Sequence, residues 1–199
     1  MGAEKFTLGL NLPTDPRWVN IAEKSIEEIL IDHAYCEQKA ASSCISLIIQ
    51  YPERDELVEV LTPVVAEEWS HFERVISKLR ERGFSLGWQR SDEYVKQLNA
   101  NMKKGGSRDD QLVERLLVNA LIEARSCERF KTLSINISDP DLKTFYYELM
   151  ISEAMHYRNF IDLAKKYMDP VKVMERWQKL LEMEAIIMKD IEPRPDRMH

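Results

Sequence analysis

Cysteine is scarce in this sequence. The 199 residues include three, Cys36, Cys44 and Cys127. An odd number of cysteines at these spacings fits neither a disulfide framework nor a zinc ribbon. All three fall in segments with a helical pattern, so we expect reduced thiols in a cytoplasmic protein.

Glycine, proline and long apolar runs are also few. The six glycines and eight prolines cluster between segments of apolar periodicity, which favours an all-α chain. The mean hydropathy is −0.40, and no run of 18 apolar residues predicts a membrane span. The first 12 residues lack the basic start and apolar core of a signal peptide. We therefore expect a cytoplasmic protein that does not enter a membrane.

Positive charge is in deficit overall but locally concentrated. The formal net charge of −6 argues against a general nucleic-acid-binding protein. Between Arg74 and Arg108, however, nine lysines and arginines face three acidic residues. This basic segment is either a solvated connection or a surface for a negatively charged partner.

The sequence contains two Glu-x-x-His motifs, Glu68 with His71 and Glu153 with His156. On a helix, positions i and i+3 lie on one face, so each motif can direct a carboxylate and an imidazole to one point. The chain has only four histidines, and these motifs use two of them. Each motif is therefore a candidate metal-binding pair.

The glutamates upstream of the motifs make this interpretation specific. Glu37 lies 31 residues before Glu68, and Glu123 lies 30 residues before Glu153. The chain thus repeats one unit, a helix with an inward glutamate followed by a helix with an inward Glu-x-x-His. This pattern is typical of a carboxylate-bridged two-metal site inside a four-helix bundle. In the usual arrangement the motif glutamates bridge the metals and the upstream glutamates are terminal ligands.

Apolar periodicity predicts the helices that carry these residues. We expect long helices at about 16–50 (with a possible break near Asn20), 53–82, 107–137, 140–167 and 170–192, and a short helix after Ser91 within a crossover at 83–107. Pro63 should kink or open the second helix. The prediction is one domain, residues 1–199, with a bundle at about 16–167 and an additional helix at about 170–192.

Other polar residues near these ligands fit the site less well. Glu128 lies about 140° around the helix from Glu123, so Glu123 is the better ligand. His33 is one turn before Glu37, as either an outer partner of the site or an ordinary core histidine. The remaining nearby glutamates, Glu67, Glu73 and Glu148, fall off the apolar stripes and should be solvated. A set rich in carboxylates suits iron or manganese better than zinc or copper.

Four stretches of the chain resemble one known family, the tRNA-(2-methylthio-N6-isopentenyladenosine-37) hydroxylases, MiaE. These stretches are His33–Ala41, Glu67–Phe72, Ile122–Phe130 and Ser152–Tyr157. The Glu-x-x-His pairs are common to all ferritin-like di-iron proteins, whereas Ile122–Phe130 is the part specific to the family. The resemblance implies an all-α, ferritin-like four-helix bundle with a long crossover between helices 2 and 3 and an extra C-terminal helix.

The same resemblance implies a function. The protein would be a non-haem di-iron monooxygenase that uses O2 and two electrons to hydroxylate the isopentenyl group of the modified adenosine at tRNA position 37. Its two iron ions would be held by Glu37, Glu68, His71, Glu123, Glu153 and His156. Anticodon-loop phosphates could contact the basic segment, through Arg80, Arg82, Arg90, Lys103, Lys104 and Arg108. Since no Cys-x-x-Cys pair or flavin motif is present, a separate protein would donate the electrons.

Two other functions fit the same ligand set. One is a ferritin-like oxidase or peroxidase acting on a small molecule. The other is a ferroxidase or iron-storage subunit, which would require a large symmetric shell. We expect a monomer or dimer, which would count against storage.

Overall fold

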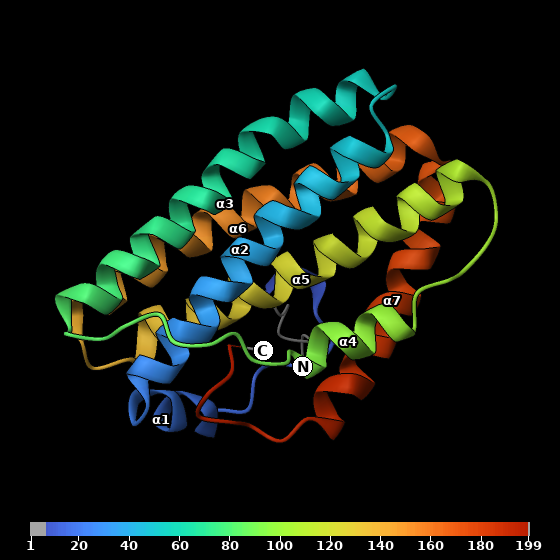
Figure 1. The fold of residues 1–199 in the computed structure, drawn as a ribbon. Coiled ribbons are helices and arrows are strands. Elements are labelled where there is room, and N and C mark those ends of the chain that lie inside the picture. The colour runs from blue at the N-terminus through green and yellow to red at the C-terminus, as the bar shows by residue number, and fades with distance from the viewer. Residues whose placement is uncertain (1–6, 199) are drawn as a thin grey trace. The chain divides into compact units, whose positions relative to one another are not determined.

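The computed structural model describes residues 7–198, and within this range it contains helices and no strands (Figure 1). The elements are η1 (Thr7–Gly9), α1 (Arg17–Glu23), α2 (Ile26–Gln50), α3 (Asp55–Glu81), α4 (Glu93–Ala100), α5 (Arg108–Asn136), α6 (Pro140–Tyr167) and α7 (Pro170–Asp190). In the described part of the chain, no helix combines the length and apolar character needed to cross a bilayer. The all-α prediction is confirmed.

Side-chain caps define where α5, α6 and α7 begin. Ser107 and Asp110 form a capping box at the start of α5. Asp139 and Asp169 accept hydrogen bonds from the first-turn amides of α6 and α7, and each is followed by proline at the first helical position. These boundaries agree with those predicted from the sequence.

Two local predictions differ from the structure. The break in the first helical segment lies at residues 24–25 and not near Asn20, because the Ser25 amide donates to Ala22 O in a turn that separates α1 from α2. Helix α3 is continuous through Pro63, which lies on its exposed side, so the predicted opening is wrong and the predicted kink stays a prediction. There the carbonyl group left without a helical donor can be hydrated, so the helix does not open.

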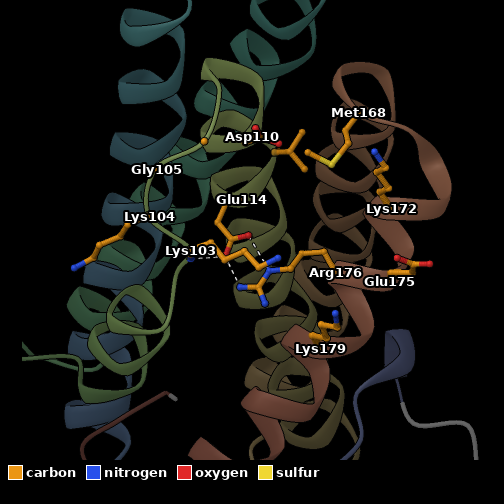
Figure 2. A pocket seen from close by; sticks show the side chains of 12 residues that line it. Lys103, Lys104, Gly105, Asp110, Glu114, Met168, Lys172, Glu175, Arg176 and Lys179 are labelled. Carbon is orange, nitrogen blue, oxygen red and sulfur yellow. Dashed lines mark hydrogen bonds and ion pairs between the residues drawn. The ribbon is translucent and has the colours of Figure 1, made fainter.

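The described chain forms two compact units. The first comprises residues 7–19 and 92–193, in which α5 and α6 pack as an antiparallel hairpin and α7 contacts α4, α5 and α6. Arg176 of α7 forms a bidentate ion pair with Glu114 of α5, with a 2.9 Å bond from Nε to Oε2 (Figure 2). The prediction of a single domain stays a prediction.

A buried polar network also crosses the first unit. The Arg125 guanidinium donates to Glu184 of α7, to Glu128 on its own helix and to the carbonyl oxygen of Leu12. Glu128 in turn accepts hydrogen bonds from the amide and hydroxyl groups of Thr14. One guanidinium therefore joins α5, α7 and the segment that precedes α1.

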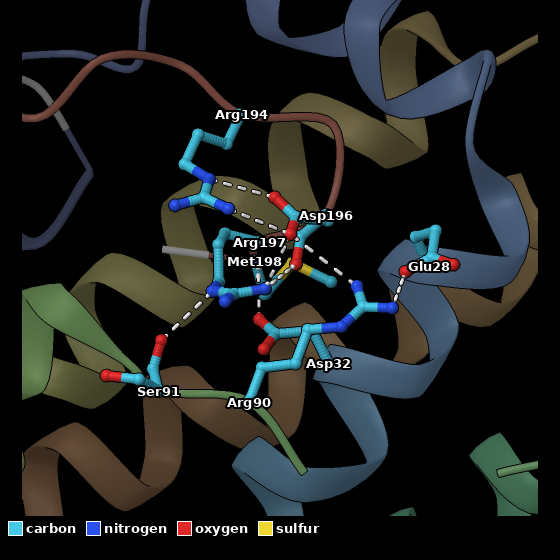
Figure 3. A network of polar contacts seen from close by, with 8 residues as sticks. All are labelled: Glu28, Asp32, Arg90, Ser91, Arg194, Asp196, Arg197 and Met198. Atoms are coloured by element: carbon cyan, nitrogen blue, oxygen red, sulfur yellow. Dashed lines mark hydrogen bonds and ion pairs between the residues drawn. The ribbon is translucent and has the colours of Figure 1, made fainter. Parts of the chain in front are cut away.

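The second unit comprises residues 20–91 and 194–198 and contains the hairpin of α2 and α3. Its C-terminal segment is anchored by polar contacts (Figure 3). The Met198 amide donates to Asp32 Oδ2 at 2.7 Å, and Arg197 Nε donates to Ser91 O at 3.1 Å. Arg90 pairs with both Glu28 and Asp196. These contacts hold the end of the crossover and the C-terminal segment against α2.

Candidate metal centre

The α2–α3 hairpin carries one triad of candidate ligands, Glu37, Glu68 and His71. All three side chains are buried, and one ligand atom from each lies within 4.8 Å of the others. His71 Nδ1 is 3.5 Å from Glu37 Oε2 and 3.8 Å from Glu68 Oε2. The two carboxylates and the imidazole therefore converge as the motif spacing predicts.

The α5–α6 hairpin carries the matching triad, Glu123, Glu153 and His156. These side chains are also buried, and their ligand atoms lie within 4.8 Å of one another. His156 Nδ1 is 4.0 Å from Glu153 Oε2. The repeated sequence unit thus produces the same local arrangement in both hairpins.

Apolar packing explains why these polar groups have fixed positions. Glu37 shares its face of α2 with Leu30, Ala34, Ala41 and Cys44, all of which are buried. In the α5–α6 hairpin, the rings of Phe130 and Tyr146 pack with centroids 5.5 Å apart. Close-packed apolar neighbours restrict the rotamers of the carboxylates, so each hairpin presents its ligands in a preorganised form.

The charged groups of the α2–α3 triad shift one another's pKa values. Burial alone would lower the pKa of His71, but the carboxylates of Glu37 and Glu68 outweigh it and raise that pKa to about 10. Burial would raise the pKa of Glu37, yet hydrogen bonds from His33 and His71 hold it well below its usual range. The carboxylates of this triad therefore favour a cation beside them, whether a proton on the imidazole or a metal ion.

His33 contacts the triad directly. It is fully buried, and its Nε2 lies 2.6 Å from Glu37 Oε1. Because an ionised carboxylate can only accept, His33 is the donor in this hydrogen bond. The side chain thus fixes one oxygen of Glu37 and leaves the other directed toward His71. This contact favours the outer-partner interpretation of His33 over that of an ordinary core histidine.

The other glutamates of these helices lie outside both triads. Glu67, Glu73 and Glu148 are not buried, as predicted. Glu128 faces away from the ligand stripe of α5 but is buried, since it accepts hydrogen bonds from Arg125 and Thr14. Its environment depends on a segment more than a hundred residues away, which helical periodicity cannot reveal.

The basic segment does not form one surface within a single unit. Arg80, Arg82 and Arg90 belong to the second unit, whereas Lys103, Lys104 and Arg108 belong to the first. Arg90 already forms ion pairs with Glu28 and Asp196.

Three basic residues of α7 that were not identified from the sequence (Lys172, Arg176 and Lys179) line a pocket with Lys103 and Lys104. Their spacing of four and three residues was the signal that could have identified them.

Comparison with known proteins identifies the family. The sequence model described as tRNA-(MS[2]IO[6]A)-hydroxylase (MiaE) matches residues 3–199. The chain belongs to the MiaE family. It is 36% identical over 187 residues to the tRNA 2-(methylsulfanyl)-N(6)-isopentenyladenosine(37) hydroxylase of Pseudomonas putida, covering 93% of this chain and 90% of the relative. The hydroxylase of the same name from Salmonella typhimurium is 26% identical over 235 residues, covering 92% and 85%.

A solved structure supports the fold of this MiaE family member. Protein 43 with aldehyde deformylating oxygenase activity, from Synechococcus, superposes with a TM-score of 0.90 at 34% identity. The match covers 96% of this chain and 94% of that one. The chain therefore has the predicted ferritin-like fold, and its buried glutamates and histidines are compatible with a two-metal centre.

Proposed function

We propose that this protein hydroxylates the isopentenyl group of 2-(methylsulfanyl)-N6-isopentenyladenosine at position 37 of tRNA. The observation that carries the proposal is the pair of buried Glu, Glu, His triads in a chain that belongs to the MiaE family. The 36% identity to the Pseudomonas putida hydroxylase over nearly the whole chain supports the same substrate.

The residues present fit two iron ions. Four buried carboxylates would be very costly without compensating cations, and two metal ions would supply that charge. The oxygen-rich donor set with two imidazoles suits iron and leaves coordination positions open for O2. We propose Glu37, Glu68 and His71 from one hairpin, and Glu123, Glu153 and His156 from the other, as the ligands. When bound, the two iron ions would activate O2 for insertion of one oxygen atom into a C–H bond.

The protein supplies positioning and exclusion of water. His33 holds Glu37 in a single orientation through the 2.6 Å hydrogen bond. Buried apolar side chains beside the ligands would accept the prenyl group and keep bulk water from the reacting carbon. The reaction consumes O2, two electrons and two protons, and it yields the hydroxylated prenyl group and one water. A separate electron-transfer protein would provide the electrons.

The experiment that tests this function is nucleoside mass spectrometry. tRNA from a strain that lacks the hydroxylase would be incubated with the iron-loaded protein, a reductant and O2. We expect the mass of the 2-(methylsulfanyl)-N6-isopentenyladenosine nucleoside to increase by one oxygen atom. Protein carrying His71→Ala serves as the negative control. Absence of the gain, in a sample with two bound irons that consumes O2, would contradict the proposed substrate.

That contrary result would favour a second function. The Synechococcus protein with aldehyde deformylating oxygenase activity shares 34% identity with this chain, so the same fold supports oxygen chemistry described for aldehydes. A small-molecule oxygenase is therefore the alternative. Oxygen consumption stimulated by an aldehyde and not by tRNA would establish it.

His33 offers a test of the hydrogen bond to Glu37. Loss of a group that orients a ligand typically lowers metal affinity by about 10–100-fold. We expect His33→Ala to weaken Fe(II) binding by this amount in an anaerobic titration. Gln38→Ala, at the next position after Glu37 on α2, is the matched control and should bind iron as the unaltered protein does. Equal iron affinity in the two variants would show that His33 serves only packing.

A further inference from the structure

A pocket outside the candidate metal centre lies at the end of the α5–α7 contact. It has a volume of about 470 Å³ and is bounded by the 103–106 loop, the first turns of α5 and the N-terminal half of α7 (Figure 2). Five basic and three acidic side chains line it, a surplus of two positive charges in a protein whose net charge is −6. We call it the basic cleft. All of its residues belong to one compact unit.

Several charges in the basic cleft are already neutralised. Arg176 and Glu114 satisfy each other in their bidentate pair, and Glu114 also accepts from the Lys103 amide at 2.9 Å. Asp110 accepts from the amide and hydroxyl groups of Ser107, so its carboxylate serves the cap of α5. Among the acidic residues of the cleft, these contacts leave Glu175 outside an ion pair or cap within residues 7–198.

The side chains of four lysines of the cleft take no part in these hydrogen bonds and ion pairs, and Lys103 and Lys172 attract the Asp110 carboxylate only at longer range. Lys103, Lys104, Lys172 and Lys179 form no ion pair with any residue in the described part of the chain. Lys172 and Lys179 flank Arg176 on one face of α7. Lys103 and Lys104 come from the loop opposite, and the Lys104 side chain is directed away from α7 (Figure 2). Lys172 also lies in the first turn of α7, where the helix dipole disfavours a cation and favours an anion. A bound anion would pair with the lysines and would also interact favourably with the dipole of α7.

The position of the cleft on α5 indicates which part of a large substrate it would meet. Glu114 lies nine residues before Glu123 on the same helix, which corresponds to about 13 Å along the axis and the opposite side of the helix. The cleft therefore does not open on the metal-ligand face of α5. A group bound there would belong to a substrate that extends well beyond the reacting nucleotide.

We propose that the basic cleft binds backbone phosphates of an RNA substrate outside the reacting nucleotide, and this inference rests on the proposed function. Flexible lysines that contact phosphate oxygens position a nucleic acid without reading its sequence. The cleft thus supplies affinity and register for the body of the tRNA, and the metal-ligand face of the hairpins receives the modified base.

The test compares two triple variants with the same change in charge. Lys103→Ala/Lys172→Ala/Lys179→Ala removes lysines of the cleft. Lys131→Ala/Lys143→Ala/Lys189→Ala removes three lysines of the same unit that lie outside it. Binding of a full-length tRNA transcript would be measured by fluorescence anisotropy at several salt concentrations. Retained iron content and circular dichroism would show that both variants keep the fold.

We expect the cleft variant to bind tRNA about tenfold more weakly and to reduce the slope of log affinity against log salt by about 2, because each lost phosphate contact contributes about 0.7–0.9. The control variant should change both quantities much less.

Equal losses of tRNA affinity in both variants would overturn the cleft proposal and leave the tRNA substrate standing. Failure of the unaltered protein to bind tRNA would instead overturn the proposed substrate, and the cleft proposal with it. Stabilisation by inorganic phosphate, without any loss of tRNA affinity in the cleft variant, would assign the cleft to a small anion and also overturn the proposal.

Discussion

Replacing His71 or His156 by alanine is expected to abolish hydroxylation. Each histidine is the single imidazole of its triad, within 4 Å of a partner carboxylate. Loss of an orienting partner alone costs about 10–100-fold, so loss of a ligand should lower turnover by more than about 100-fold. Iron content should fall below two ions per chain while the helical circular dichroism spectrum persists. Two irons per chain in both variants would contradict the ligand assignment.

The double variant makes this prediction more specific. If the two triads serve one centre, residues that act as a unit show strongly non-additive effects. His71→Ala/His156→Ala should therefore be no less active than either single variant. If the double variant instead loses activity by the product of the two single losses, the triads form two independent metal sites. Glu67→Gln and Glu148→Gln are matched controls, since both are exposed glutamates on the helices that carry the motifs, and their turnover should remain near that of the unaltered protein.

Replacing Arg125 by alanine is expected to destabilise the fold strongly. Arg125 is fully buried and donates to Glu184 Oε1 from Nε at 2.8 Å and to Glu128 Oε2 from Nη1 at 3.0 Å. Its removal leaves two buried carboxylates without their cation and the Leu12 carbonyl without its donor. Breaking a buried pair in this way costs about 3–5 kcal/mol. Urea unfolding followed by circular dichroism would measure the loss.

The loss of folding stability caused by Arg125→Ala should depend on pH. Burial already raises the pKa of Glu184, even though Arg125 opposes that shift, and removal of Arg125 should raise it further. An acid whose pKa is higher in the folded state stabilises the fold at low pH and loses this contribution as pH rises through the folded pKa. The destabilisation by Arg125→Ala should therefore be smaller at pH 5 than at pH 7.5. A loss independent of pH would contradict a role for the carboxylates.

Two control variants separate the buried pair from general effects of arginine removal. Arg125→Met/Glu184→Leu replaces both partners with apolar groups and should recover much of the lost stability. Arg17→Ala removes an exposed arginine paired with Asp15 and should have little effect. If the double variant is as unstable as Arg125→Ala, packing and not charge explains the loss.

The same network gives a structural role to Ile122–Phe130, the stretch on which the sequence-based resemblance to the family chiefly rested. Ile122–Phe130 contains one candidate ligand, Glu123, together with Arg125, Glu128 and Arg129. The Arg129 guanidinium stacks over the Trp18 ring at 4.1 Å, and burial and the nearby Arg125 lower its pKa to about 9. Three residues of this stretch, Arg125, Glu128 and Arg129, therefore join α5 to α7 and to residues 12–18. The sequence showed the resemblance, but it did not show that these residues connect α5 to distant segments.

Local rules predicted the helices and the ligand stripes well. Caps such as Ser107 and Asp139 act through hydrogen bonds to amides two or three residues away, so the sequence nearby contains the whole interaction. The convergence of Glu68 with His71 and of Glu153 with His156 follows from helical geometry for the same reason. The break at residues 24–25 was misplaced because no strong cap marks it; Ser25 makes no side-chain cap hydrogen bond.

The sequence by itself determined the helical class, the boundaries of the capped helices α5, α6 and α7, and the two repeated ligand units, because each depends on residues close together in the chain or on the spacing of helices; its resemblance also identified the family. Only the tertiary structure decided the partners of buried charges. It placed Glu128 beside Arg125 and Thr14, joined His33 to Glu37, and brought the lysines of α7 to the 103–106 loop. The physical reason is that a hydrogen bond or an ion pair depends on distance in space, and the packing of distant segments sets that distance.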